Sequence, residues 1–186
     1  SALDQLASRV DNLEPVNYAP TTIVFGNATQ EYDIDGETWV AATAGVPDAA
    51  SHLLAAALAA IATPYDGSFL VVREKNGAAS ATNPMTITFT FPTVETFNVI
   101  KFVSFYHGST THTMVFELYN GATWDIFTSE HDETYFQLHV AEVLVPTSYI
   151  IAGTVTGRFR HLEAGNTSHH FKLDYLVIAS GGGVGA

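Results

Sequence analysis

Residues 85–91, MTITFTF, alternate strictly between apolar and hydroxyl-bearing side chains. A period of two places one face of a β-strand on a core and the other toward water. Short runs of this kind, rich in β-branched and aromatic residues and bounded by Gly, Asn, Pro or Asp, recur from Thr21 to Ala179. The pairs Asn120-Gly121 and Gly165-Asn166 are turn signals between them. Strands at this frequency, without βαβ alternation, predict an all-β jelly-roll β-sandwich.

One segment departs from the strand pattern. PDAASHLLAAALAAIATP, residues 47–64, is dominated by Ala and predicts a short helix over 48–62. Asp48 or Ser51 can cap its start, and Pro64 prevents its continuation. Its apolar stripe carries no charge, so we expect it to be buried against the sandwich or a neighbouring subunit; the stripe consists of Leu53, Leu54, Leu58 and Ile61.

The first 15 residues predict a short coiled-coil-like helix that ends at Pro15. Apolar residues occupy the a and d positions of two heptads, namely Leu3, Leu6, Val10 and Leu13. Two heptads are too short to associate alone, so the helix either docks on its own domain or forms part of an oligomeric stem, and we favour the stem. The expected organisation is a helical oligomerisation or anchoring stub at 1–15, a linker at 16–20, a jelly roll at 21–179 and a Gly-rich tail at 180–186.

Charge and composition exclude several classes of function. The net charge of −12 opposes binding to a phosphate backbone, which draws its affinity from Lys and Arg. Cysteine is absent, so no disulfide or thiolate metal site can form. The most apolar segment, 52–62, is shorter than the roughly 20 residues that span a bilayer, and SALDQLASRV does not have the pattern of a signal peptide. We therefore expect no nucleic-acid partner and no membrane insertion.

Two motifs in the second half suggest a known type of module. VFELYNGATW predicts a central hairpin, and VTGRFRHL followed by HHFKLDYLVIA predicts a closing pair of strands. Together they resemble the galactose-binding-like jelly roll of carbohydrate-binding and discoidin-type modules. With the heptad stub and the Gly-rich tail, the chain also resembles structural proteins of tailed-phage virions, such as a tail fibre, a spike or a head-decoration protein.

The resemblance to virion proteins implies a homo-oligomer, expected to be a trimer, that contacts other proteins of the bacteriophage particle. It implies a non-catalytic role in particle assembly or host attachment, with a cell-surface glycan as one class of receptor. A cellular carbohydrate-binding module is the alternative. A glycan-degrading enzyme is a third reading, because carboxylates from distant strands can converge. No G-x-S-x-G or HExxH motif occurs, and we expect no enzymatic activity and no cofactor.

The closing strands carry the candidate ligand-binding cations. We expect 153–162 and 168–179 to be antiparallel neighbours joined by a loop at 163–167, with Arg158 near Asp174. Arg158 and Arg160 then share an outer face with Lys172, while the inward residues are Phe159, Phe171, Leu173 and Tyr175. This basic strip can bind an acidic sugar, a phosphate or an acidic partner. The alternative is a solvated ladder of charges that contributes little.

Aromatic residues near turns are the other candidates for ligand binding. Tyr106 and Trp124 lie at strand ends or beside turns, as do His107, Tyr119 and Tyr135. Such rings can stack on sugars at the surface, or they can pack beneath loops or at a subunit interface.

Three groups of His, Asp and Glu residues are close enough in the sequence to be considered as metal ligands, and each can also be an ordinary loop or turn. His161, His169 and His170 flank one loop, but adjacent residues of a strand point to opposite faces. We therefore expect hydrogen-bonded histidines and no metal ion. Asp33, Asp35 and Glu37 lie around Gly36, and they form either a calcium site or an ordinary acidic turn. SEHDE at 129–133 predicts a solvated loop.

Overall fold

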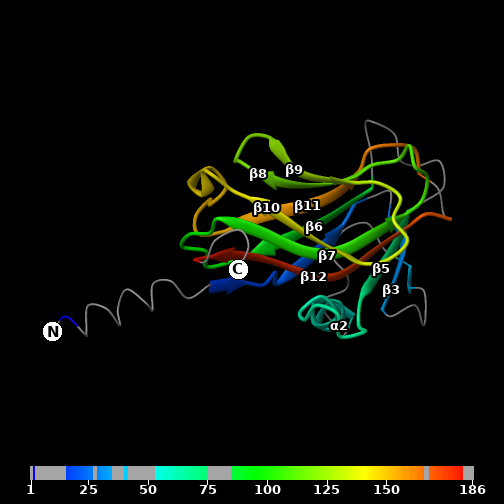
Figure 1. Ribbon diagram of the computed structural model, residues 1–186, viewed down its shortest axis with the longest axis horizontal. Helices are drawn as coiled ribbons and strands as arrows, with labels where there is room; N and C mark the ends of the chain where they lie inside the picture. The colour runs from blue at the N-terminus through cyan, green and yellow to red at the C-terminus, as the bar shows by residue number, and fades with distance from the viewer. Residues whose placement is uncertain are drawn as a thin grey trace.

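The computed structural model describes residues 2, 16–26, 29–34, 40–41, 53–74, 85–165 and 168–181. They form a seven-stranded and a five-stranded sheet, stacked on each other (Figure 1). The seven-stranded sheet has the order β10 (Gln137–Glu142), β7 (Val99–His107), β12 (His170–Ser180), β5 (Leu70–Glu74), β3 (Thr29–Ile34) and β4 (Val40–Ala41), with β1 (Val16–Tyr18) also paired to β12. The five-stranded sheet has the order β2 (Thr22–Phe25), β6 (Thr86–Phe91), β11 (Val155–His161), β8 (Met114–Tyr119) and β9 (Trp124–Glu130).

The chain passes repeatedly between the two sheets. β6 belongs to the five-stranded sheet, β7 to the seven-stranded sheet, β8 and β9 to the first again, and β10, β11 and β12 then alternate. Every strand pair within the described ranges is antiparallel. Antiparallel strands that alternate between two packed sheets form a jelly-roll β-sandwich. The predicted fold class is therefore confirmed.

The core is aromatic and forms where the inner faces of the sheets meet. On β6 the predicted alternation is confirmed, because Ile87, Phe89 and Phe91 are fully buried and the intervening threonines are not. Phe159 of β11 lies 5.1 Å from Phe102 of β7 and 4.6 Å from Phe171 of β12 between ring centroids. Burying each side chain of this kind contributes about 1.5–3 kcal/mol. These rings join the two layers.

Gly157 on β11 provides room for one of the core rings. A Cβ atom built there would lie 2.6 Å from Cζ of Phe116 on β8. The ring therefore occupies the volume that a side chain at position 157 would take. A glycine in a strand often marks such a close approach.

The Ala-rich helix covers one edge of the sandwich. α2 (Leu53–Ala60) contacts β2 and β3 and lies below β12 and β5 in Figure 1. Ala57 and Ile61 are fully buried, and Leu58 packs partly buried against the core. The predicted burial is confirmed at these positions, whereas the side chains of Leu53 and Leu54 lie outside the described set. No helix in the described ranges is long and apolar enough to cross a bilayer.

The predicted hairpin of the two closing strands is wrong. β11 pairs with β6 and β8, whereas β12 pairs with β7, β5 and β1 in the opposite sheet. β11 ends in one sheet and β12 begins in the other, so the two strands do not form a hairpin. Alternation indicates which face of a strand is buried but not which strand lies beside it. Arg158 therefore does not face Asp174.

The predicted inward faces of β11 and β12 are confirmed only in part, and the prediction is wrong for Tyr175 and Asp174. Phe159, Phe171 and Leu173 are buried, as predicted. The register shifts between Leu173 and Tyr175, so that Asp174 is buried at 2% exposure and Tyr175 is partly exposed. Asp174 accepts a hydrogen bond of 2.5 Å from the N–H of Tyr65. Burial raises its pKa, and this hydrogen bond partly opposes the increase.

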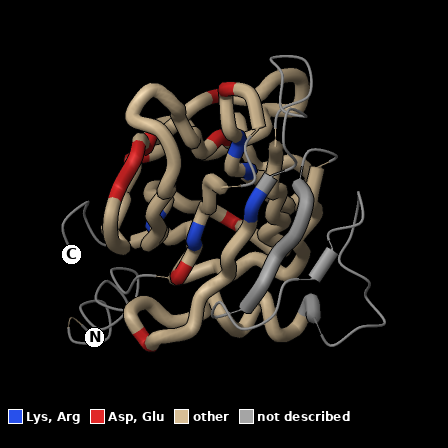
Figure 2. Tube along the Cα trace, turned by 90° about the vertical axis from the view of Figure 1, so that its right-hand side faces the viewer, with Lys and Arg blue, Asp and Glu red and all other residues tan. Residues whose placement is uncertain are grey.

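The structure describes part of the expected linker and little of the N-terminal helix or the Gly-rich tail. Val16–Tyr18, within the expected linker at 16–20, form β1 and pair with Ile178–Ser180 of β12. The heptad positions Leu3, Leu6, Val10 and Leu13, and residues 182–186 of the tail, lie outside the described residues. Charged residues are sparse along the described trace (Figure 2).

Candidate functional site

The outer face of the five-stranded sheet combines hydroxyls, two arginines and aromatic rings. β11 is its central strand, and Arg158 pairs in register with Thr88 of β6 and Glu117 of β8. We call this surface the outer face and define it by Thr86, Thr88, Thr90, Thr156, Arg158, Arg160, Glu117, Tyr119 and Trp124. Its side chains alternate with the buried core residues of the same strands.

Glu117 holds both arginines. Its carboxylate accepts hydrogen bonds of 2.6 Å from Nε of Arg158 and 2.6 Å from Nη2 of Arg160, and its side chain is 2% exposed. Burial by itself raises the pKa of Glu117, but the bonds and positive charges of Arg160 and Arg158 outweigh it and lower the pKa below 4.5. Two guanidinium groups and one carboxylate give this triad a net charge of +1. A solvated ladder of exposed charges is therefore excluded for these residues.

Trp124 extends the triad with an aromatic surface. The guanidinium carbon of Arg158 lies 4.0 Å from the centre of the Trp124 ring, and the ring of Tyr119 lies 5.2 Å from it. Both rings are partly exposed. A cation over the face of an indole is attracted by the ring quadrupole. Trp124 and Arg158 therefore hold each other in place at the surface.

A tight turn positions Trp124. The predicted Asn120-Gly121 turn joins β8 and β9, and Gly121 has a φ of +94°, which favours glycine. Oδ1 of Asn120 accepts hydrogen bonds from the N–H groups of Ala122, at 3.0 Å, and Thr123, at 2.8 Å. Trp124 follows directly, so the start of β9 is fixed by backbone geometry.

The structure brings together three of the five residues predicted to bind ligand. Arg158, Arg160 and Trp124 lie on the outer face. Lys172 is on the opposite sheet, where its ammonium group lies 4.9 Å from the ring centre of Phe105 and 5.6 Å from that of Phe69. The predicted basic strip is wrong in this respect, because β12 and β11 are not neighbours. Tyr106 is buried at 1% exposure and offers no surface ring.

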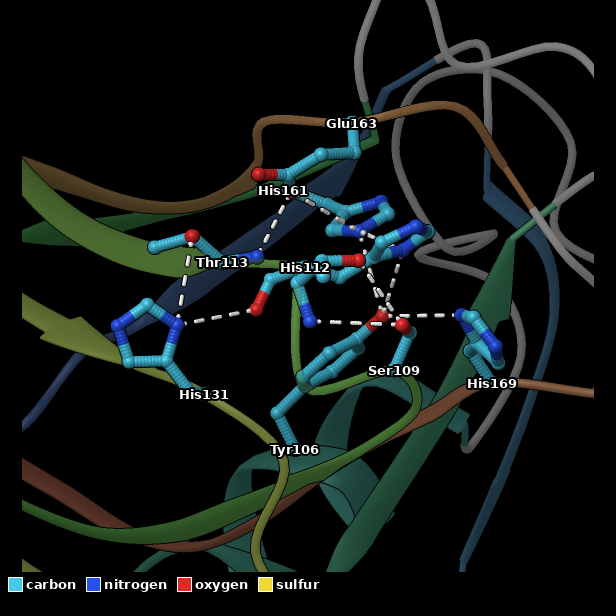
Figure 3. Close-up of polar contacts among 9 residues, drawn as sticks. Tyr106, Ser109, His112, Thr113, His131, His161, Glu163 and His169 are labelled. Carbon is cyan, nitrogen blue, oxygen red and sulfur yellow. Dashed lines mark hydrogen bonds and ion pairs between the residues drawn. The ribbon is translucent and has the colours of Figure 1, made fainter.

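Tyr106 instead lies at the centre of a histidine cluster (Figure 3). Its phenol oxygen is 3.2 Å from Nε2 of His161, 3.1 Å from Nδ1 of His169 and 3.5 Å from Nδ1 of His112. Nε2 of His161 and Nδ1 of His112 are 3.1 Å apart. We define the histidine cluster as Tyr106, His112, His161, Glu163 and His169.

Glu163 completes the cluster on the side of β8. Its Oε2 atom lies 3.5 Å from Nε2 of His161 and accepts a hydrogen bond of 2.7 Å from the N–H of Thr113. His161 is fully buried, while His112, Glu163 and His169 are partly buried. Gly108 leaves space for the phenol, because a Cβ atom there would overlap the hydroxyl oxygen of Tyr106.

The sequence indicates only part of this cluster. His161 and His169 stand out beside one loop, whereas His112 lies in the β7–β8 connection and is placed by the fold. His170 points elsewhere: it pairs with His107 on the outer side of β7. Burial lowers the pKa of His170, and the charges of Lys172 and Arg73 lower it further.

A second polar cluster lies between the edge strands β9 and β10. Glu130 is 3% exposed and accepts a hydrogen bond of 2.8 Å from Ser104, and Nε2 of His139 lies 3.0 Å from its carboxylate. Burial and then the charge of Glu130 raise the pKa of Glu133 to about 7. Burial lowers the pKa of His139, but the bond to Glu130 and the charges of both glutamates raise it overall. The predicted solvated loop at 129–133 is therefore wrong at Glu130.

The predicted acidic turn around Gly36 lies outside the residues whose side chains the structure describes. Asp35 and Glu37 lie outside the described residues, as does the side chain of Asp33. The possible calcium site there remains a prediction from sequence.

Comparisons with known proteins give similarity only at the level of structure. No protein family model and no curated protein matches the chain. A solved family 29 carbohydrate-binding module has a TM-score of 0.47 and 9% identity over 90% of both chains. A point mutant of a family 29 module has a TM-score of 0.49 and 8% identity over 90% of this chain and 94% of that one. A structure described as "CBM4 structure and function" has a TM-score of 0.47 and 11% identity over 91% and 98%. All three scores are below 0.5, so the assignment to a jelly-roll sandwich rests on this chain's own strand order.

Proposed function

We propose that the chain is a non-catalytic glycan-binding protein and that the outer face of the five-stranded sheet binds the saccharide. The observation that carries this proposal is the Trp124 ring, partly exposed and held under the Arg158 guanidinium at 4.0 Å. An aromatic face at the surface stacks on the CH groups of a sugar ring. The neighbouring guanidinium groups and threonine hydroxyls supply hydrogen-bond donors and acceptors to sugar hydroxyls.

The charge of the outer face favours an acidic saccharide. Glu117, Arg158 and Arg160 together carry +1, on a chain whose net charge is −12. Arginine forms paired hydrogen bonds with carboxylate and phosphate oxygens. The side chains of Arg158 and Arg160 are 22% and 24% exposed, so they reach solvent while they hold Glu117.

A glycan array followed by calorimetry with the best oligosaccharide tests the proposal. Trp124→Ala should abolish retention, because the stacking surface is lost, and Trp124→Phe should retain part of it. Tyr135→Ala is the control, since Tyr135 is a 67% exposed aromatic residue in the connection between β9 and β10 and is not among the residues of the outer face. Undiminished binding by Trp124→Ala, or no retention of any glycan by the folded chain, would refute the proposal.

The salt dependence of binding tests the preference for an acidic ligand. Affinity for an acidic oligosaccharide should fall as NaCl rises from about 0.05 M to about 0.5 M, because screening weakens exposed charge pairs. Affinity for a neutral analogue should change little. Arg158→Lys keeps the charge beside Glu117 but loses the planar stack on Trp124, so it should weaken binding in a chain that still unfolds cooperatively.

The setting that we propose is the surface of a virus particle, with the chain as a trimer. Support comes from the heptad pattern at 1–15 and the Gly-rich tail, which lie outside the described residues apart from Ala2, Ser180 and Gly181. Light scattering of the whole chain tests it. A trimer that dissociates when residues 1–15 are removed, with the sandwich still melting cooperatively, supports the stem. A monomer favours the cellular carbohydrate-binding module.

The geometry of Glu130 and Glu133 disfavours a glycan-degrading enzyme. A raised pKa beside a second carboxylate is typical of acid–base pairs. However, Glu130 is 3% exposed, and its carboxylate is engaged by Ser104 and His139. A general acid or base must come within hydrogen-bond reach of the substrate. The burial of Glu130 therefore favours a structural role for the pair.

A further inference from the structure

We propose that the histidine cluster is a binding site for a divalent transition-metal ion, with zinc as the expected occupant. The ligands are His112, His161 and Glu163, and the phenol of Tyr106 takes the fourth corner (Figure 3). This site is separate from the outer face and goes beyond glycan binding. It also revises the expectation from sequence that these histidines bind no metal.

The distances between the candidate ligand atoms match a tetrahedral zinc site. Zinc binds imidazole nitrogen and carboxylate oxygen at about 2.0–2.2 Å, which places tetrahedral ligands about 3.3–3.6 Å apart. Nε2 of His161 lies 3.1 Å from Nδ1 of His112 and 3.5 Å from Oε2 of Glu163. One ligand atom from each of these three residues lies within 4.8 Å of the others.

The phenol oxygen of Tyr106 completes the same arrangement. It lies 3.2 Å from Nε2 of His161 and 3.5 Å from Nδ1 of His112. Four of the six distances in the proposed tetrahedron therefore fall between 3.1 and 3.5 Å. His169, with Nδ1 at 3.1 Å from the phenol oxygen, lies on its other side and can accept the phenol proton in a hydrogen bond.

Hydrogen bonds alone do not satisfy all the close contacts around Nε2 of His161. A ring nitrogen of imidazole carries at most one proton. Nε2 of His161 nevertheless lies within 3.5 Å of a phenol oxygen, a second imidazole nitrogen and a carboxylate oxygen. One N–H group cannot point at all three partners. A cation at their centre accepts a lone pair from each, so convergence on one point is what metal coordination requires.

The surrounding backbone orients the ligands. The N–H of Thr113 donates to Oε2 of Glu163 at 2.7 Å, and Nδ1 of His131 lies 3.2 Å from the carbonyl oxygen of His112. A hydrogen bond to a coordinating carboxylate, such as that from Thr113, fixes its direction and is typical of metal sites, whereas the contact of His131 holds the backbone of His112 and not its ring.

The donor set selects the class of ion. Two imidazoles with one carboxylate and one phenol suit zinc and its neighbours in the transition series. Calcium takes six to eight oxygen ligands, and magnesium keeps several waters. We therefore expect neither to compete. Tyr106 belongs to β7 of one sheet and His161 to β11 of the other, so the ion would join the two layers in a chain that has no cysteine.

Zinc titration of the whole chain, free of any affinity tag and stripped with EDTA, tests the site. Calorimetry should give about one zinc per chain, and saturating zinc should raise the melting temperature by several degrees, because a ligand of the folded state stabilises it. Magnesium and calcium should do neither. His112→Ala and Glu163→Gln should each weaken zinc affinity at least about tenfold; both side chains are partly exposed, so these variants avoid the fully buried His161.

Three further variants locate the bound ion. His107→Ala removes an exposed histidine, with a side chain 58% exposed, and should leave affinity unchanged. Glu133→Gln alters the other group of candidate ligands, Glu130, Glu133 and His139, and should also leave it unchanged. Trp124→Ala should bind zinc normally whether or not it binds glycan. Absence of stoichiometric zinc binding by the folded chain, full affinity in both His112→Ala and Glu163→Gln, or loss of affinity in Glu133→Gln would overturn the proposal.

Discussion

Replacing Glu117 by Gln isolates the energetic role of the buried carboxylate beneath the outer face. The carboxylate receives bonds from Nε of Arg158 at 2.6 Å and from Nε and Nη2 of Arg160 at 3.0 and 2.6 Å. The amide of Gln has one acceptor oxygen, and its NH2 group cannot accept from a guanidinium, so at least one charged bond is lost and the others become neutral, a loss of about 3–4 kcal/mol. Breaking a buried ion pair costs about 3–5 kcal/mol, and because both arginines are partly exposed we expect the loss of folding free energy to stay below the upper end of that range.

Urea unfolding at pH 7, followed by tryptophan fluorescence, measures the effect. Glu117→Gln should lower the midpoint without changing the slope, since the surface exposed on unfolding is the same. Glu142→Gln is the matched control, because Glu142 is an exposed glutamate on β10. A Glu117→Gln variant within about 0.5 kcal/mol of the parent chain, the usual range for surface substitutions, would refute the assignment of Glu117 as the anchor of both arginines.

The pH dependence gives an independent check. The pKa of Glu117 is lower in the folded chain than its ordinary value of 4.5. Its ionised form therefore stabilises the fold fully above pH 4.5, and this contribution is lost as the pH falls from 4.5 through the lower folded pKa. The difference between the parent chain and Glu117→Gln should shrink over that window. A difference that is the same at pH 7 and in acid would contradict the lowered pKa.

Three other substitutions test the core and the second polar cluster. Burial and the charge of Glu130 raise the pKa of Glu133 to about 7, so the ionised form of Glu133 opposes folding, and Glu133→Gln should raise the melting temperature above pH 7 by the equivalent of about 1–3 kcal/mol. This gain should vanish below pH 4.5, and a gain that is the same at every pH would contradict the raised pKa. Gly157→Ala should cost about 1–3 kcal/mol in urea unfolding, since its Cβ would lie 2.6 Å from the Phe116 ring, and an unchanged midpoint would show that the ring moves freely. Leu58→Asp should also cost about 1–3 kcal/mol, because its side chain packs partly buried against the core, and a neutral result would show that the helix face is exposed.

The faces of the strands could be predicted from sequence, but their neighbours could not. Alternation along MTITFTF identifies Ile87, Phe89 and Phe91 as inward residues. The same reasoning is correct for Phe159 and Phe171, although they lie in different sheets. A short connection favours a hairpin, and no local pattern distinguishes a turn within one sheet from a crossing between two. Strand pairing depends on contacts between segments far apart in the chain, which alternation does not encode.

The candidate sites depend on the same long-range placement. Arg158 and Arg160 could be assigned to one outward face because they are two residues apart on one strand. Glu117, 41 and 43 positions away, stands in an apolar run with no sign of its partners. His112 and Glu130 become part of polar clusters only through the stacking of the two sheets. The sequence displays the chemical groups, and the topology determines which of them meet.

The position of β12 constrains how the chain can fold during synthesis. β12 is the last strand that the structure describes, yet it lies inside the seven-stranded sheet, bonded to β7 on one side and to β5 and β1 on the other. Val16 pairs with Ser180, so the first and last described strands meet. Contacts of such separation slow folding to the range of milliseconds to seconds. Until β12 leaves the ribosome, β7 and β5 each present an open edge in the middle of the future sheet, and such edges pair readily with other chains. A nascent chain therefore exposes both edges to pairing with other chains until β12 is synthesised, and each added second of translation lengthens that exposure.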